Sequence, residues 1–239
     1  MPSQRRLDAL PARVTITGAD DRVDPRDLVA LSVRFPFVEW GILFSATRAG
    51  QPRYPTEDWV RSLVRAAGRQ SVHLAAHLCG ARAREVLGGV AWDDDLRPAF
   101  DRVQLNGYKD LTLVFCDMAW SPVSGSPEFI LQARTDAGLA TALRDQHRIP
   151  RGSVLVDPSG GQGLDAHAMW AAIEAGDEWI GFAGGITPAN VMDAIAFLGQ
   201  RRSGPYWIDM ESGVRIDDVF DLRLAAEVLE QVAGAMVRP

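Results

Sequence analysis

Residues 154–163, VLVDPSGGQG, place a single acid between an apolar run and a glycine-rich turn. Asp157 ends the apolar run, and Gly160, Gly161 and Gly163 follow it. A carboxylate at the end of a strand can transfer a proton, and glycines let backbone amides approach a phosphate closely. The same pattern is also common in a simple turn that ends a buried strand. Other polar groups at equivalent positions must decide between these two interpretations.

Two further glycine-bearing turns follow apolar runs nearer the C-terminus, in AGGITPANV and ESGVRIDDVFDL. Loops that follow the last strands of an α/β barrel are the usual place for a phosphate. A single Gly-Gly pair would indicate only a tight turn, whereas three such turns at adjacent strand ends favour a phosphate site. The expected phosphate-binding residues are Gly160, Gly161, Gly163, Gly184, Gly185, Ser212 and Gly213.

Eight short apolar runs recur at near-even intervals and predict buried strands. They span residues 13–18, 38–45, 72–80, 102–107, 128–134, 154–157, 179–185 and 206–213. Helical patterns lie between most of them, for example one that begins with Asp24 as N-cap and Pro25 in the first turn. A second begins with Thr56 as N-cap.

Strands that alternate with helices predict a parallel sheet, and eight units predict an α/β fold of the (β/α)8 TIM-barrel type. A doubly wound open sheet is the competing architecture. We expect a single domain over residues 1–239, with residues 1–12 as a flexible N-terminal extension. Residues 108–126 mix strand and helix signals and are expected to form a decorated loop.

Polar residues at the predicted strand ends should meet at one mouth of the barrel. His77 and Cys79, at the end of the third strand, could form a proton-transfer pair. A buried structural cysteine beside a hydrogen-bonded histidine is the favoured interpretation. Arg134, at the end of the fifth strand, could hold an anionic substrate or pair with Asp157. His73 lies early in its strand and should face the other end of the barrel.

Composition excludes several classes of function. The 239 residues contain 25 Lys and Arg against 31 Asp and Glu, a net charge of −6, which argues against nucleic-acid or anionic-membrane partners. Cys79 and Cys116 give neither a metal-ligand spacing nor a disulfide framework, so no metal is expected. No redox cofactor is expected, since no dinucleotide fingerprint is present. We expect a cytoplasmic protein without a signal peptide or membrane span, as a monomer or homodimer.

Six segments resemble motifs of the phosphoribosylanthranilate isomerase family, in the same order and at roughly the same spacing. They are TITG, QPRYP, QLNG, VDPSGGQG, AGGITPANV and IDMESGVR. The resemblance covers nearly the whole chain, is specific over 154–221 and is weak over 72–134. It implies a tryptophan-pathway TIM barrel that opens a ribose ring and moves a proton from carbon two, an Amadori rearrangement.

The resemblance implies that Asp157 is the general acid and that Arg53 lies near the anthranilate part of the substrate. Three positions depart from the family pattern. Thr17 stands where the family has its general-base cysteine, and a hydroxyl is a much poorer proton acceptor than a thiolate. Asn106 replaces a histidine of the fourth strand. Glu211 replaces a serine of the eighth, and a carboxylate there would repel a phosphate unless it faces away or is protonated.

Three functions are compatible with these residues. The first is an isomerase or related lyase that acts on a phosphorylated sugar derivative, with phosphoribosylanthranilate or another compound as substrate. The second is a non-catalytic barrel that binds a small phosphorylated metabolite and has lost its general base. The third is an enzyme of unrelated chemistry that uses His77 and Cys79. The candidate catalytic residues are Asp157, Thr17, Cys79 and His77, and the candidate substrate-binding residues are Arg53, Arg134 and Asn106.

Overall fold

A computed structural model describes most of the chain. The described residues are 10–68, 70–87, 95–106, 127–136, 138, 142, 151–160, 166–173 and 178–237. Gly161, Gly163, Cys116 and the expected loop 108–126 lie outside them, as do residues 1–9 of the expected N-terminal extension. Residue 12 already belongs to the folded part, because its amide donates a hydrogen bond to the Tyr206 carbonyl at 2.8 Å.

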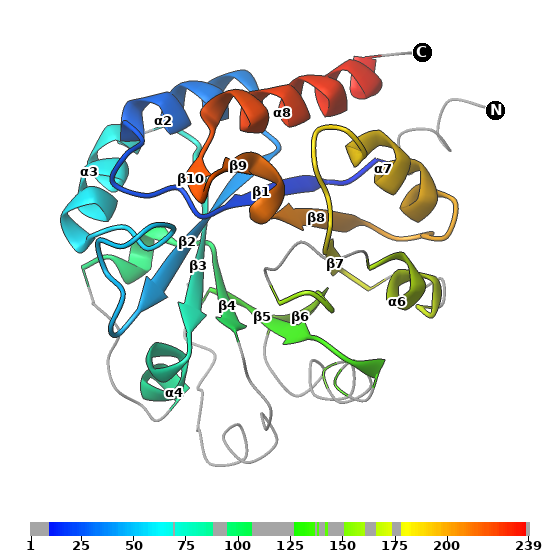
Figure 1. Cartoon of the computed structure of the whole chain (residues 1–239), viewed down its shortest axis with the longest axis horizontal. Coiled ribbons are helices and arrows are strands. Elements are labelled where there is room, and N and C mark those ends of the chain that lie inside the picture. The colour runs from blue at the N-terminus through cyan, green and yellow to red at the C-terminus, as the bar shows by residue number, and fades with distance from the viewer. Residues whose placement is uncertain are drawn as a thin grey trace.

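Eight parallel strands form a closed barrel (Figure 1), as the alternation of apolar runs predicts. Each strand pairs with the next along the chain, and the eighth pairs with the first. The strands are β1 (Arg13–Thr17), β2 (Val38–Ser45), β3 (His73–Cys79), β4 (Arg102–Asn106), β5 (Glu128–Ala133), β6 (Gly152–Val156), β7 (Ile180–Ala183) and β8 (Tyr206–Met210). The fold is therefore a (β/α)8 TIM barrel and not an open sheet.

The helices lie on the outer side of the strands (Figure 1). They are α2 (Pro25–Arg34), α3 (Glu57–Ala67), α4 (Ala81–Leu87), α6 (His167–Ala171), α7 (Val191–Gly199) and α8 (Leu222–Val237), with the 3-10 turns η1 (Arg97–Ala99) and η3 (Ser212–Val214). A small hairpin of β9 (Arg215–Ile216) and β10 (Val219–Phe220) follows η3.

Two helices begin where their capping residues predict. The Asp24 side chain accepts a hydrogen bond from the Arg26 amide at 2.9 Å, with Pro25 as the first residue of α2. The Thr56 hydroxyl accepts one from the Trp59 amide at 3.3 Å at the start of α3. These bonds satisfy amides that have no partner within the helix.

The lower interior of the barrel is filled by a buried charged network. Arg102 donates hydrogen bonds to Glu39 at 2.9 Å and to Glu128 at 3.2 Å, and its guanidinium lies 4.0 Å from the ring centre of Trp207. Arg13 adds an ion pair to Glu39 at 3.1 Å. Among the described residues, these side chains fill the barrel interior at the end where the strands begin.

Candidate active site

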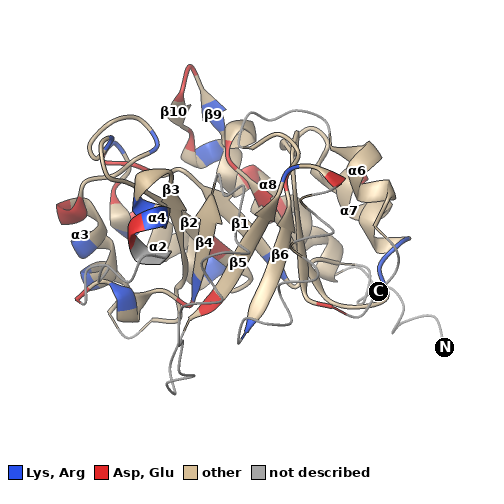
Figure 2. Ribbon diagram, turned by 90° about the horizontal axis from the view of Figure 1, so that it is seen from below, with Lys and Arg blue, Asp and Glu red and all other residues tan. Residues whose placement is uncertain are grey.

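A cavity of about 790 Å³ opens at the mouth where the strands end. The ends of all eight strands or the loops that follow them contribute to its lining. The hairpin β9–β10 carries charged side chains and projects beyond the strand ends at this mouth (Figure 2). The cavity contains the predicted residues Thr17, Arg53, His77, Cys79, Asn106, Arg134, Asp157, Gly160, Gly185, Ser212 and Gly213. The structure thus brings together residues that are far apart in the sequence.

The turn after β6, residues 157–160, is organised by the Asp157 carboxylate. Its Oδ1 accepts hydrogen bonds from the Ser159 amide at 3.1 Å, the Ser159 hydroxyl at 2.7 Å and the Gly160 amide at 3.0 Å. Its Oδ2 accepts one from Gln132 Nε2 at 2.7 Å. Asp157 therefore stabilises the turn that ends β6 and at the same time lines the cavity.

Arg134 lies against this turn. A Cβ atom at Gly160 would come within 2.6 Å of the Arg134 Nη2, and Gly160 has a φ of +58°. A residue with a side chain would thus meet both the guanidinium and an unfavourable backbone conformation. The Arg134 side chain is exposed at the rim of the cavity.

The turns after β7 and β8 touch each other at the cavity wall. Gly184 and Gly185 have φ values of +114° and +70°, and a Cβ at Gly213 would overlap the carbonyl of Ile186. The Asn190 side chain donates to the Gly185 carbonyl at 2.8 Å and accepts from the Thr187 amide at 2.7 Å. Glycine is favoured at 184 and 185 because of these positive φ values, and at 213 because the backbone of the neighbouring turn leaves no room for a side chain.

Arg53 is already paired with two acids at the rim. It donates to Glu211 at 2.6 Å through Nη1 and to Asp218 at 2.6 Å through Nε. Burial raises the pKa of Glu211, and the charge of Arg53 acts in the opposite direction. The Glu211 carboxylate therefore faces a cation, which limits the repulsion that its position beside the phosphate turns would otherwise produce.

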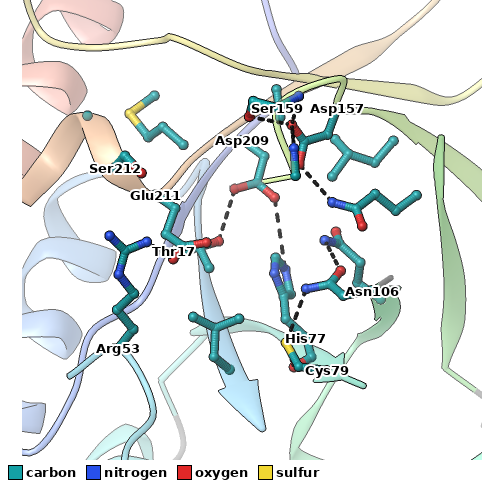
Figure 3. A pocket seen from close by; sticks show the side chains of 18 of the residues that line it. Thr17, Arg53, His77, Cys79, Asn106, Asp157, Ser159, Asp209, Glu211 and Ser212 are labelled. Carbon is teal, nitrogen blue, oxygen red and sulfur yellow. Dashed lines mark hydrogen bonds and ion pairs between the residues drawn. The ribbon is translucent and has the colours of Figure 1, made fainter. Parts of the chain in front are cut away.

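The floor of the cavity holds a cluster of Thr17, His77 and Asp209, which we call the floor cluster (Figure 3). The Thr17 hydroxyl donates to Asp209 Oδ1 at 2.9 Å, and His77 Nε2 lies 4.0 Å from Asp209 Oδ2. Burial raises the pKa of Asp209 well above its ordinary value, whereas the hydrogen bond from Thr17 lowers it. Burial and the nearby Arg102 lower the pKa of His77 to about 3, so its imidazole is neutral.

Cys79 and the His77 ring face different partners. The Cys79 thiol donates to the His77 backbone carbonyl at 3.7 Å and accepts from Asn106 Nδ2 at 3.5 Å. Asn106 in turn accepts from Gln104 Nε2 at 2.8 Å. The His77 ring is directed toward Asp209 instead (Figure 3). Burial raises the pKa of Cys79, which disfavours a reactive thiolate.

His73 lies at the opposite end of β3, as its place in the sequence predicts. Its Nδ1 lies 2.9 Å from an oxygen of Asp101, in a contact that is half exposed. This pair is outside the cavity lining. His73 therefore takes no part in the site.

Sequence reasoning missed Asp209 and Gly41. Asp209 precedes Glu211 by two residues, so both side chains face the barrel interior, and an acid inside an apolar strand was the available signal. Gly41 interrupts β2, and a Cβ there would overlap the Thr17 hydroxyl and lie 3.0 Å from His77 Nε2. A glycine inside a strand often marks such a close approach.

Two further expectations concern metals and membranes. Within the described ranges, no group of three or more His, Cys, Asp or Glu side chains could hold a metal ion. The helices of the described part are all too short or too polar to cross a membrane.

Comparisons with known proteins agree with the geometry. The family model of N-(5'-phosphoribosyl)anthranilate (PRA) isomerase matches residues 98–231, more than half of the chain. A phosphoribosyl anthranilate isomerase structure from Thermus thermophilus aligns with a TM-score of 0.59 at 16% identity. The N-(5'-phosphoribosyl)anthranilate isomerase structure from Pyrococcus furiosus aligns with 0.57 at 13%. Each alignment covers 93% of this chain and 98% of the other. No curated protein sequence matches the chain at a significant level.

Proposed function

Because the chain belongs to the N-(5'-phosphoribosyl)anthranilate isomerase family, we propose that it isomerises a phosphorylated sugar derivative from an aldose to a ketose by an Amadori rearrangement. One observation carries this proposal. In a single cavity, Asp157 lies on the turn after β6 and glycine turns follow β7 and β8. A carboxyl that can transfer a proton, next to backbone amides that suit a phosphate, supports this reaction.

The phosphate half of the substrate is assigned to the turns after β6, β7 and β8. Gly185, Ser212 and Gly213 line the cavity there, and the backbone packing at Gly213 leaves no room for a side chain. Amides in such turns bind phosphate oxygens without the entropic cost of ordering long side chains. Gly161 and Gly163, which the sequence also predicts at the phosphate, lie outside the described residues.

Asp157 is assigned as the general acid that opens the sugar ring. Its proton would pass to the ring oxygen while the bond between C1 and that oxygen breaks. The lone pair of the substituent nitrogen then forms a double bond to C1, so charge and electrons balance. The hydrogen bonds from Gln132, Ser159 and Gly160 fix the position of the carboxyl group during this step.

The other half of the substrate would extend toward Arg134. Arg53 already meets Glu211 and Asp218, so its charge is balanced within the protein. The exposed guanidinium of Arg134 lies beside the Asp157 turn and can hold an anionic group such as a carboxylate. We therefore take phosphoribosylanthranilate as the first substrate to test, with Arg134 at its carboxylate.

The test is turnover of phosphoribosylanthranilate, followed as loss of its fluorescence, by the wild type and by Asp157→Asn. The asparagine side chain keeps an oxygen that can accept from Ser159 and Gly160, so the turn should survive. We expect a fall in kcat of about 100-fold or more, because a positioned acid contributes that much. The matched control is Ser159→Ala, which removes one hydrogen bond from Asp157, keeps its proton and should cost less.

Unchanged turnover in Asp157→Asn would contradict the assignment of the acid. A wild type that binds ribose 5-phosphate but turns over no phosphosugar amine would favour the second candidate function, a metabolite-binding barrel. The observation behind that candidate is Thr17, a poor proton acceptor at the end of β1. A wild type that neither binds nor reacts would exclude both functions.

A further inference from the structure

The proposed reaction needs a second proton-transfer group, and we propose that Asp209 is that group. It would accept the proton from C2 of the substrate, with Thr17 and His77 as the residues that position it. This inference rests on the proposed isomerase function. The reasons are the position of Asp209 in the cavity, the direction of its hydrogen bond with Thr17, and an unpartnered nitrogen on His77.

The geometry of the floor cluster depends on Gly41. Thr17 is opposite Gly41 in the register of β1 and β2, and His77 is opposite Leu43 in the register of β2 and β3. The missing side chain at Gly41 lets Thr17 and His77 approach each other across β2. Asp209 enters from β8, on the other side of β1, and its carboxylate lies between the two (Figure 3).

Thr17 and Asp209 are joined by a hydrogen bond in which the hydroxyl is the donor. A carboxylate oxygen can only accept here, so the Thr17 hydroxyl must direct its proton at Asp209 Oδ1, at 2.9 Å. A carboxylate is a far better proton acceptor near neutral pH than a neutral hydroxyl, so Asp209 is the member of this pair that can act as the base. Thr17 instead fixes the orientation of the carboxylate and leaves Oδ2 to face the rest of the cluster.

His77 offers a buried polar atom without a partner. Its Nε2 is fully buried and has no hydrogen bond among the described residues, and His77 is one of the residues that line the cavity. The 4.0 Å between Nε2 and Asp209 Oδ2 is too long for a hydrogen bond. A substrate hydroxyl placed over both atoms would satisfy Nε2 and would bring the adjacent carbon next to Oδ2.

The surroundings of Asp209 make its carboxylate a stronger base than an exposed one. Burial raises its pKa, and the negative charges of Glu211 and Glu39 act in the same direction. Asp157 adds to them once it has given its proton to the substrate. The hydrogen bond from Thr17 opposes them, and neutral His77 brings no positive charge. A higher pKa brings the group closer to the working pH, where general base catalysis is most effective.

The proton transfers balance with Asp157 and Asp209 in these roles. After ring opening, Asp209 takes the proton from C2 while the electrons of that bond form a double bond between C1 and C2. The electrons of the C1–N double bond return to nitrogen. Asp209 then returns its proton to C1 as the C2 hydroxyl gives its proton to Asp157. Both carboxyl groups end in their starting states, and the product is the ketose.

The first experiment measures kcat for phosphoribosylanthranilate and the affinity for ribose 5-phosphate in the wild type and in Asp209→Asn. We expect kcat to fall about 100-fold or more, with the phosphate affinity within about twofold of the wild type. Unchanged turnover in Asp209→Asn would overturn this inference and leave the isomerase function standing. A wild type without turnover would overturn the function itself, and the inference with it.

The second experiment tests the positioning role of Thr17 through the pH dependence of kcat/KM. Thr17→Val removes the donor that lowers the pKa of Asp209, so the acidic limb of the profile should move to higher pH. Thr17→Ser keeps a hydroxyl and should return the limb to the wild-type position. A merely structural role would lower the rate of Thr17→Val without moving the limb, and that result would contradict the inference even if Asp209→Asn did not fold.

Discussion

The cavity contains two buried aspartates whose environments differ sharply. Asp157 and Asp209 are 4% and 5% exposed, so burial does not distinguish them. Among the described residues, Gln132, Ser159 and Gly160 donate four hydrogen bonds to Asp157, whereas Asp209 accepts one from Thr17. The first carboxylate organises a turn, and the second organises no backbone within the described residues.

This difference teaches that the number and direction of donors, rather than burial, separate the roles of the two acids. A buried carboxylate with few donors is costly to keep ionised. We therefore expect Asp209 to contribute less to stability than Asp157, in agreement with the role in proton transfer that we propose for it. Enzymes that hold two carboxyls in unlike environments can use one as acid and the other as base.

We expect the largest effect from a substitution that disrupts the floor cluster and leaves the Asp157 turn unchanged. In Gly41→Ala the new methyl group would overlap the Thr17 hydroxyl and press on His77. We expect a loss of about 1–3 kcal/mol in the free energy of unfolding, measured by urea denaturation, because the packed interior must shift. Turnover should fall as well, since the hydrogen bond between Thr17 and Asp209 is displaced.

The matched control for this prediction is Gly234→Ala on α8. A Cβ at Gly234 would meet no atom within 4 Å, so alanine should stabilise the helix by about 0.5–1 kcal/mol. Equal effects at the two glycines would show that the close approach over Gly41 is not tightly constrained.

We expect a smaller effect on the pH dependence of the free energy of unfolding, which also distinguishes the two aspartates. A carboxyl whose pKa is raised in the folded state binds more protons when folded, so the free energy of unfolding falls as pH rises. For Asp209 this fall begins near the ordinary aspartate pKa of about 4 and ends above its raised pKa. Asp209→Asn should therefore gain about 1 kcal/mol or more over the wild type as pH rises through this window.

The difference between the two unfolding curves isolates Asp209. The raised pKa of Glu211 also makes the free energy of unfolding fall as pH rises. The lowered pKa of His77 makes it fall as pH drops from about 6.5 toward about 3. Both contributions are present in each protein and cancel to first order. A stability difference that did not change with pH would contradict the raised pKa of Asp209.

The smallest effect concerns the third acid, Glu211, which stands between the two aspartates and the rim. Glu211→Gln removes the buried partner of Arg53 and leaves the pair with Asp218, which is half exposed. We expect the affinity for ribose 5-phosphate to rise about three- to tenfold, or up to about 1.4 kcal/mol. Asp218→Asn, the control at the exposed partner, should change it by less than about twofold. Equal changes would contradict the importance of burial at Glu211.

The fold followed closely from the sequence because its signals are local. Apolar runs marked all eight strands, and the caps Asp24 and Thr56 marked helix starts. The start of β6 was missed by two residues, since Gly152 and Ser153 do not look like a strand. Both residues belong to it because they pair with the neighbouring strand β5, with Gly152 opposite Phe129 and Ser153 opposite Ile130.

The site was less predictable. Most of the residues expected at the strand ends do line the cavity, because parallel strands place their ends at one edge. Asp209 is the residue before the last one of β8. No local pattern distinguishes a buried acid that contacts a ligand from one that only supports the structure. The pairing of Arg53 with Glu211 joins residues 158 positions apart and has no signal in either segment.

The sequence by itself determined the barrel, its strand order and the glycine turns, since periodicity and backbone freedom act over a few residues. Only the tertiary structure decided which donors form hydrogen bonds with which acids. Asp157 accepts hydrogen bonds from amides two and three residues later in the chain. Asp209 accepts one from Thr17, which is 192 positions away and becomes its neighbour only when β8 pairs with β1. Proton affinity depends on distances of a few ångströms, and the fold sets those distances only when the last strand joins the first.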